Sequence, residues 1–316
     1  MRPSGLAALV LSALLLGACV GTPALDPQRT AVLPVRAELA TTPFYPQEAD
    51  HCGPASLAMV LTARGMPAEP KDLAPTVFLP ARKGSLPLDM LGGARRAGAV
   101  AMRTPPSLES VMEHVASGLP VIVLQNLSLP IYPMWHYAVV VGFDRAERVL
   151  YLRSGLEERQ VIGWGTFDRT WARSGRWAMI ATSPGDMPPQ AERAPYVEAA
   201  LALERLGKTP QANLAYEAGV RRWPGDLTLA VGAGNTAYAV GDLDRSERAF
   251  REALEHHPAS GAILNNLANV LARAGRLEEA ESLAERAVSI PGSHHDAALG
   301  TLQEIRERRT APSSIR

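Results

Sequence analysis

The sequence predicts an α+β domain followed by an all-α domain, and two observations lead to this fold class. Apolar residues recur with helical spacing over residues 53–64, 88–98 and 107–117. Apolar runs typical of strands come after them, namely LPVIVLQN, HYAVVVGFD, RVLYLRS and RWAMIATS, and this order indicates an α+β arrangement. From about residue 193 a helical pattern with a period of 34 residues takes over, and 316 residues suit two domains.

The first residues contain a short apolar segment that ends at a cysteine. The segment LAALVLSALLLGAC contains an apolar run of about eleven residues, which suits a signal-peptide core and is too short to span a bilayer. It ends on Leu16-Gly17-Ala18-Cys19, which resembles the lipobox, where the cysteine is diacylated and becomes the new N-terminus. We therefore expect residues 1–18 to be removed and Cys19 to be lipidated; the alternative is an ordinary signal peptide before a spare cysteine.

The residues after Cys19 suggest a location and a tether. Val20 stands where an aspartate commonly retains lipoproteins in the inner membrane, so we expect an anchor in the outer membrane, facing the periplasm. Residues 19–40 carry three prolines and little periodicity, which predicts a tether. After residue 20 no apolar run reaches the roughly 18 residues of a membrane-spanning helix. Lys plus Arg equals Asp plus Glu at 32 each, so we expect no nucleic-acid partner.

Cys52 has the setting of a nucleophile. If Cys19 is lipidated, Cys52 has no partner for an intrachain disulfide. The run GPASLAMVLTARG fits a helix that starts at this cysteine, with Pro54 in the first turn and Gly65 past the end, and a helix N-terminus lowers the pKa of a thiol. Gln47 lies five residues upstream and offers an amide to the oxyanion that forms on attack. Imidazole is the usual base for such a thiol.

Two motifs in this order resemble a known peptidase family. They are Gln47…Cys52-Gly53-Pro54-Ala55-Ser56-Leu57-Ala58-Met59-Val60 and Trp135-His136-Tyr137-Ala138-Val139-Val140-Val141. They resemble the papain-like cysteine peptidases that trim double-glycine leaders from bacteriocins, and the resemblance covers residues 41–183. It implies that Cys52 is the nucleophile, His136 the general base and Gln47 the oxyanion donor. The chain lacks a phosphate-binding loop, so it resembles the stand-alone, exported members.

The third catalytic position departs from that family. An aspartate or asparagine usually follows on the next strand to orient the imidazole, where this chain has Ser154. A serine accepts a hydrogen bond from His136 but brings no charge, so we expect a Cys–His dyad. Asp144 lies at a hairpin turn and is expected to form that turn.

The tail is similar to tetratricopeptide repeats. Glycines recur 34 residues apart at Gly207, Gly241 and Gly275, and Tyr216, Phe250 and Ala284 keep the same spacing. We expect a linker at residues 184–192, three helical hairpins and a capping helix over residues 193–308, and a tail at residues 309–316. Such solenoids typically bind a peptide or a partner protein. Asn235, Asn265 and Asn269 are candidates for gripping a peptide backbone, and a ligand-free polar surface is the alternative.

The other histidines give no catalytic or metal signal. His51 is expected in a solvated turn and His114 on the surface of an amphipathic helix. The pairs His256-His257 and His294-His295 point apart on a helix, so we expect no metal and no cofactor.

The sequence therefore predicts a lipid-anchored cysteine peptidase that hydrolyses an exported or periplasmic protein or peptide, with repeats that recruit the substrate or a partner. Two alternatives remain open at this point. One is an acyltransferase or amidase on the same fold, and the other is a non-catalytic lipoprotein scaffold with a degenerate peptidase domain.

Overall fold

The computed structural model describes residues 23–47 and 50–310. The expected signal peptide and the lipidation site Cys19 lie outside these residues. Within this part of the chain, no helix combines the length and apolar character needed to cross a membrane. The chain divides into two compact units: Met1–Ala63, Pro67–Pro87 and Arg103–Ile180 form the first, and Arg64–Met66, Leu88–Met102 and Ala181–Arg316 form the second. The segment Leu88–Met102, expected in the first domain, is thus grouped with the repeats by its contacts.

A seven-stranded sheet positions the candidate site. Its order is β2-β7-β3-β4-β5-β6, and β1 pairs with β4 off this path. The strands are β1 (Arg36–Glu38), β2 (Val100–Arg103), β3 (Val121–Asn126), β4 (Trp135–Asp144), β5 (Val149–Ser154), β6 (Glu157–Gly163) and β7 (Ala178–Thr182). β4 runs antiparallel to β3, β5 and β1. Its residues 137–143 are all buried, so both faces of this strand are covered.

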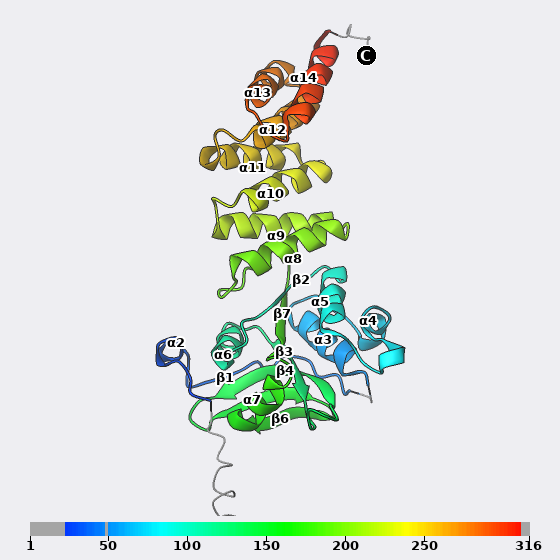
Figure 1. Ribbon diagram of the computed structural model, residues 1–316, viewed down its shortest axis with the longest axis vertical. Helices are drawn as coiled ribbons and strands as arrows, with labels where there is room; N and C mark the ends of the chain where they lie inside the picture. Colours follow the sequence, from blue (N-terminus) through cyan, green and yellow to red (C-terminus); the bar gives the residue numbers. More distant parts are fainter. Residues whose placement is uncertain (1–22, 48–49, 311–316) are drawn as a thin grey trace, which may run out of the picture. The chain divides into compact units, whose positions relative to one another are not determined.

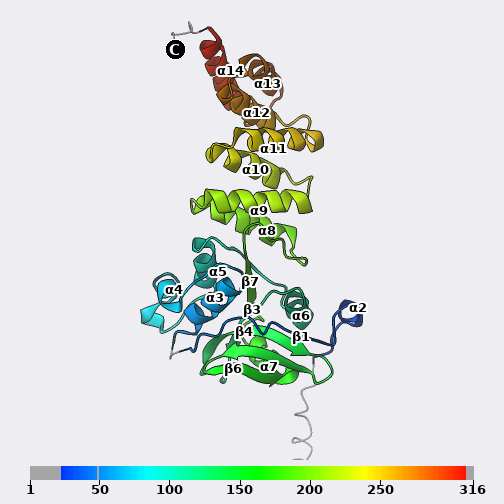
Figure 2. The ribbon, with the colours of Figure 1, turned by 180° about the vertical axis from the view of Figure 1, so that it is seen from behind.

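Helices cover the sheet in the first unit (Figures 1 and 2). α3 (Cys52–Ala63) packs on β3 and β4, α6 (Leu108–Ala116) packs on β1, β3 and β4, and α7 (Trp164–Ala172) packs on β3, β5 and β6. α4 (Pro70–Val77) packs on α3 and is followed by the short 3-10 helix η2 (Pro80–Arg82). α3 is almost entirely apolar and buried from residue 53 to 61, which explains why its first residue is fixed against the sheet. Gly65 follows it with a φ of 72°, a left-handed conformation that ends helices.

The expected helices and strands are confirmed. The helices predicted over 53–64 and 107–117 are α3 and α6, and the helix predicted over 88–98 is α5 (Pro87–Arg96). The four apolar runs form β3, β4, β5 and β7. β6 and α7 were not predicted, because EERQVIG is a mostly polar edge strand and the helix after it is short.

The tether expected over residues 19–40 is wrong for its described part. α2 (Pro27–Ala31) contacts α6, where the backbone N–H of Asp26 donates to Glu109 (2.8 Å) and Arg29 forms an ion pair with Glu113 (2.7 Å). β1 then pairs with the end of β4. Gly142 makes this approach possible, since a Cβ there would lie 2.9 Å from the carbonyl oxygen of Ala37 and 2.6 Å from the ring of Tyr151. We call residues 26–42 the N-terminal strap.

Three helical hairpins and a terminal helix make up the repeats. They are α8 (Arg193–Arg205) with α9 (Thr209–Arg222), α10 (Leu227–Ala239) with α11 (Leu243–His256), α12 (Gly261–Arg273) with α13 (Leu277–Ser289), and α14 (His295–Thr310). Gly207, Gly241 and Gly275 have φ values of 70°, 84° and 83°, which confirms that each turns a hairpin. A Cβ on Gly234 would lie 2.4 Å from the ring of Phe250, so the small residue is required where the two helices of a hairpin touch.

Candidate active site

Cys52 is the first residue of α3 and is half-buried. Burial raises the pKa of its thiol, and the nearby carboxylate of Asp50 acts in the same direction. The backbone N–H groups of Tyr137, Gly53 and Cys52 itself oppose this rise, because they stabilise the thiolate. The helix start therefore stabilises the thiolate as predicted, but burial outweighs it. The thiol pKa is raised, whereas the sequence suggested a lowered one.

His136 lies near the start of β4, and its ring is held by β5. The Nε2 atom lies 3.0 Å from the Oγ atom of Ser154, the last residue of β5. In the tautomer that carries its proton on Nε2, His136 donates to the serine and Nδ1 is free to accept a proton. Burial lowers the pKa of His136. Burial thus favours the neutral form of both the thiol and the imidazole.

Gln47 is buried and its amide has one orientation. Its Oε1 atom accepts a hydrogen bond from the backbone N–H of Gly155 (2.9 Å), and its Nε2 atom donates to the Oγ atom of Ser56 in α3 (3.2 Å). The backbone N–H of Gln47 donates to the carbonyl oxygen of Gly155 (3.0 Å). Because Gly155 fixes the amide oxygen, the second N–H of Nε2 remains available for a substrate oxygen.

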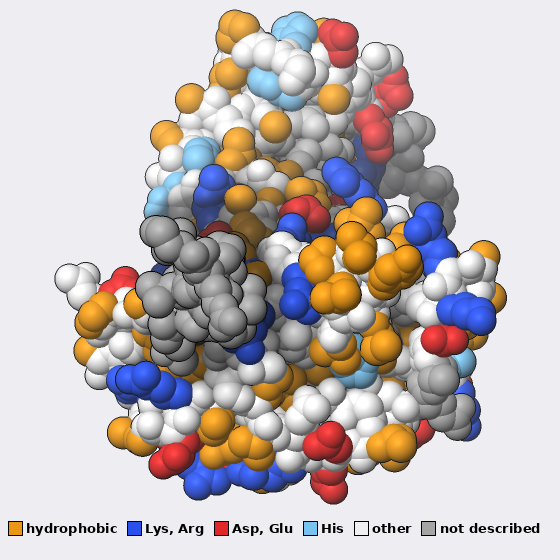
Figure 3. Space-filling view, turned by 60° about the horizontal axis from the view of Figure 1, so that its bottom comes forward, with side chains coloured by type: hydrophobic (Ala, Val, Ile, Leu, Met, Phe, Trp, Pro, Cys, Tyr) orange, Lys and Arg blue, Asp and Glu red, His pale blue; other side chains and the backbone are white. Residues whose placement is uncertain are grey.

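These residues meet at one cavity of about 870 Å³. Its lining includes Gln47, Cys52, His136 and Gly155, which come from segments up to about a hundred residues apart in sequence. The structure thus brings Gln47, Cys52 and His136 to one cavity, with Ser154 beside the imidazole; their catalytic roles stay a prediction. The loop between β3 and β4 has several exposed apolar side chains. Hydrophobic side chains are grouped on the face of the molecule that Figure 3 shows.

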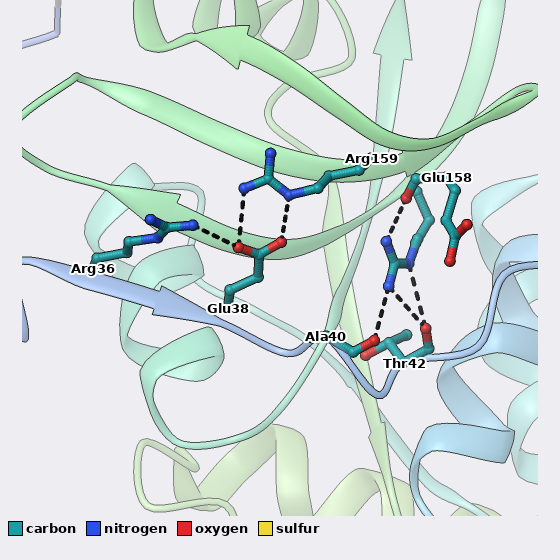
Figure 4. A network of polar contacts seen from close by, with 7 residues as sticks. Arg36, Glu38, Ala40, Thr42, Glu158 and Arg159 are labelled. Atoms are coloured by element: carbon teal, nitrogen blue, oxygen red, sulfur yellow. Dashed lines mark hydrogen bonds and ion pairs between the residues drawn. The ribbon is translucent and has the colours of Figure 1, made fainter.

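Arg153 lies outside the cavity lining and supports the segments that carry the site, a role that the sequence did not reveal. It is only 4% exposed, and its guanidinium donates to backbone carbonyl oxygens of Ala40, Thr42 and Glu158 (Figure 4). Those to Ala40 and Thr42 measure 3.1 Å. Arg153 precedes Ser154, and Thr42 lies five residues before Gln47, so this side chain joins the segments that carry both residues. Nothing in the sequence marks an arginine whose partners are distant backbone carbonyls.

Glu38, a residue of the same strap, holds it against β6. Its carboxylate accepts hydrogen bonds from Arg159 on β6 (2.6 and 3.0 Å) and from Arg36 (3.1 Å), as Figure 4 shows. These donors lower the pKa of Glu38. The Arg159 guanidinium also lies over the ring of Tyr151, 4.0 Å from its centroid. The N-terminal strap is therefore attached to the sheet at the end of β1, through Glu38, and after β1, through Ala40 and Thr42.

Other candidate side chains have structural roles. Asp144 accepts hydrogen bonds from the backbone N–H groups of Ala146 (2.9 Å) and Glu147 (3.0 Å), so it forms the predicted turn. His51 stacks on Phe78, with ring centroids 4.5 Å apart. The surface position expected for His114 is wrong, because this side chain is only 2% exposed. In residues 23–47 and 50–310 no group of three or more His, Cys, Asp or Glu residues is arranged to hold a metal ion.

The three candidate asparagines of the repeats differ in exposure. Asn235 is exposed and accepts a hydrogen bond from Asn266 (3.0 Å). Asn269 donates to the Oγ1 atom of Thr301 in α14 (3.2 Å), which ties the third hairpin to the terminal helix. Asn265 is 8% exposed, and its Oδ1 atom is buried without a partner among the described residues. The amide oxygen of Asn265 is therefore not at the surface, and a peptide-binding role for this residue stays a prediction.

Comparison with family models agrees with this geometry. Residues 40–179 match the model of the Peptidase_C39 like family. The chain contains a C39-like peptidase domain. Residues 231–298 match a tetratricopeptide repeat model, so repeats follow the peptidase-like domain and the predicted fold class is confirmed. A search of curated proteins finds no match.

Solved structures resemble the C39-like domain and the repeats separately. A protein described as a C39-like peptidase from Bacillus anthracis is 19% identical, with a TM-score of 0.39, over 46% of this chain and 97% of that one. The type III secretion chaperone SycD of Yersinia enterocolitica, bound to a peptide of the translocator YopD, is 18% identical, with a TM-score of 0.34, over 36% of this chain and 92% of that one. At these TM-scores the family models carry the assignment.

Proposed function

We propose that the C39-like domain is a cysteine peptidase that hydrolyses peptide bonds of an exported or periplasmic protein, with Cys52 as nucleophile and His136 as base. The observation that carries the proposal is the meeting of Gln47, Cys52 and His136 at one cavity, with the base held by Ser154. A buried inert cysteine would need neither an imidazole nor an oriented amide at its cavity.

The chemistry follows from the neutral resting pair. His136 takes the thiol proton on Nδ1 as the sulfur attacks the substrate carbonyl carbon, so charge separation develops only during attack. The oxyanion is stabilised by the Nε2–H of Gln47 and the backbone N–H of Cys52. His136 then returns the proton to the leaving amine, which departs as the thioester forms. Water, deprotonated by the same imidazole, hydrolyses the thioester and frees the thiol.

The repeats recruit the substrate or a protein partner in this proposal. Asn235, joined to Asn266 on the neighbouring repeat, is the exposed candidate for a backbone contact. The SycD and Spaghetti neighbours were each solved with a bound peptide, and the Spaghetti structure is 16% identical, with a TM-score of 0.35, over 37% of this chain and 91% of that one. Asn235→Ala with Asn266→Ala should weaken partner capture and leave cleavage of a short peptide unchanged.

The proposal also includes an outer-membrane lipid anchor at Cys19, facing the periplasm. It rests on the lipobox-like sequence and on Val20 after it. Cys19→Ser should move the protein from the membrane to the soluble fraction or block its processing, as followed by membrane fractionation. Unchanged membrane attachment of that variant would refute the anchor.

The peptidase itself is tested by comparing new N-termini in the exported proteome with and without Cys52→Ala. Cleavage products that require the thiol support the proposal. An added amine in a purified reaction separates hydrolysis from acyl transfer, since a transferase would give an amide adduct in place of a new carboxylate. If a thiolate-directed alkylating probe does not label Cys52 at any pH while the protein is folded, the site is inert and the proposal fails.

A further inference from the structure

Positive charge without an acidic partner among the described residues lines the cavity. Arg82, Lys83 and Arg173 all line it, whereas Asp50 is the single acidic side chain among the described lining residues. No carboxylate in the described part of the chain forms an ion pair with Arg82 or Lys83. Arg173 donates to the backbone carbonyl oxygens of Asn126 (3.0 Å) and Ser128 (2.6 Å), which keeps its charge at the cavity. The cavity therefore has an excess of cations that no acid of the described chain neutralises.

The loop that carries two of these cations is held in place. The backbone N–H of Leu79 donates to the carbonyl oxygen of Gly84 (2.8 Å), and that of Arg82 donates to the carbonyl oxygen of Leu79 (2.9 Å). The hydroxyl of Tyr137, next to His136, donates to the carbonyl oxygen of Ser85 (3.3 Å). The positions of Arg82 and Lys83 are thus fixed relative to the strand that carries the base.

The cavity lining also contains exposed apolar side chains. Leu127 and Met134 line it from the β3–β4 loop, Trp135 from the first position of β4, and Leu86 from the loop after Lys83. The β3–β4 loop is closed by a hydrogen bond from the backbone N–H of Leu127 to the carbonyl oxygen of Met134 (2.9 Å). When a ligand covers large apolar side chains at the mouth of a cavity, it removes them from water, and this favours binding.

We propose that this cavity selects peptides in which an aspartate or glutamate lies beside a large apolar residue. Arg82 and Lys83 bind the carboxylate, and Leu127, Met134 and Trp135 receive the apolar side chain. The inference rests on the proposed peptidase function and adds the class of substrate to it. A peptide is favoured over an anionic membrane because the cations and apolar groups line the same concave cavity as Cys52, which a bilayer surface cannot enter.

The test is cleavage of a peptide mixture whose members differ only at one position, with Glu, Gln or Lys next to a Leu. Two exposed cations should favour Glu over Gln by about tenfold in kcat/KM, and the preference should shrink as NaCl rises. Arg82→Glu combined with Lys83→Glu should reverse the order and favour the Lys peptide. Lys71→Glu is the matched control, because Lys71 is exposed on α4 outside the cavity lining, and it should keep the preference for Glu.

The two proposals fail in different ways. Cleavage of the Glu, Gln and Lys peptides at equal rates would overturn the substrate class and leave the peptidase standing. If no peptide is cleaved, the peptidase proposal fails, and fluorescence anisotropy with the Cys52→Ala variant still decides the selectivity. Equal affinity for the Glu and Gln peptides there would refute the inference. The inference would also be refuted if the protein bound phosphatidylglycerol vesicles but no peptide, and if Arg82→Glu with Lys83→Glu abolished that vesicle binding.

Discussion

Replacing Ser154 is the most direct test of how His136 is held. Ser154→Ala removes the acceptor that lies 3.0 Å from Nε2 of His136. A neutral hydrogen bond contributes about 0.5–1.5 kcal/mol, so kcat should fall by about two- to twelvefold and KM should change little. The larger loss expected for a third catalytic residue should not appear, because the serine orients the ring and brings no charge.

Ser154→Asp adds the charge that the wild-type chain lacks. A carboxylate beside Nε2 stabilises the imidazolium and should raise the pKa of His136, which burial now holds below its usual value. The acidic limb of the kcat profile should therefore move to higher pH in Ser154→Asp. The assay is steady-state cleavage of one peptide from pH 5 to pH 9. Ser117→Ala, an exposed serine at the end of α6, is the control and should match wild type.

Two results would refute this reasoning. A loss for Ser154→Ala as large as that for His136→Ala would show that the enzyme depends on a triad. An unchanged kcat for Ser154→Ala, with an unchanged acidic limb for Ser154→Asp, would show that the contact has no part in catalysis.

Four further predictions concern the site and its supports. Cys52→Ala and His136→Ala should each abolish cleavage, and the double variant should lose little more activity because the two side chains act as one unit. Gln47→Ala should lower kcat by about a hundredfold to a thousandfold. Because burial raises the thiol pKa of Cys52, alkylation by iodoacetamide should accelerate into the alkaline range, and a rate plateau between pH 5 and pH 7 would instead show a resting ion pair. Burial lowers the pKa of His114 to about 4, so the folded state is favoured while this imidazole is neutral, above pH 6.5, and loses stability as pH falls. Urea unfolding should show the free energy of unfolding falling by about 2 kcal/mol between pH 7.5 and pH 5, and His114→Leu should remove that fall. Arg153→Met should lower the free energy of unfolding by about 3 kcal/mol. Arg153→Lys should be more stable than Arg153→Met, but its kcat should stay below that of wild type with KM little changed, because lysine lacks the forked guanidinium that joins the strap to β5.

The elements that carry Cys52 and His136 were predictable from local rules, whereas the pairing of these two residues was implied only by the resemblance to the peptidase family. Cys52 begins a helix whose apolar run, early proline and late glycine are visible in the sequence, and His136 begins a buried strand. The hydrogen bond between His136 and Ser154 follows from adjacent strands, since β4 and β5 form a hairpin. Such features depend on contacts between neighbours in the chain.

Two errors share one cause, which is the N-terminal strap. Its prolines and lack of periodicity suggested a tether, but its backbone groups find partners on β4 and α6, which no side-chain pattern reveals. Arg153 was missed for the same reason, because its acceptors are strap carbonyls 111 and 113 residues away.

The serine at position 154 is consistent with the electrostatics of the whole site. Both Cys52 and His136 have pKa values displaced by burial toward their neutral forms. A carboxylate at position 154, where the side chain is only 7% exposed, would itself have to be desolvated, and it would face a neutral imidazole in the resting enzyme. A hydroxyl avoids that cost and still fixes the tautomer that leaves Nδ1 free to accept the thiol proton. In the proposed mechanism the dyad therefore generates its charges only during attack, when the amide of Gln47 and the backbone N–H of Cys52 would stabilise the oxyanion.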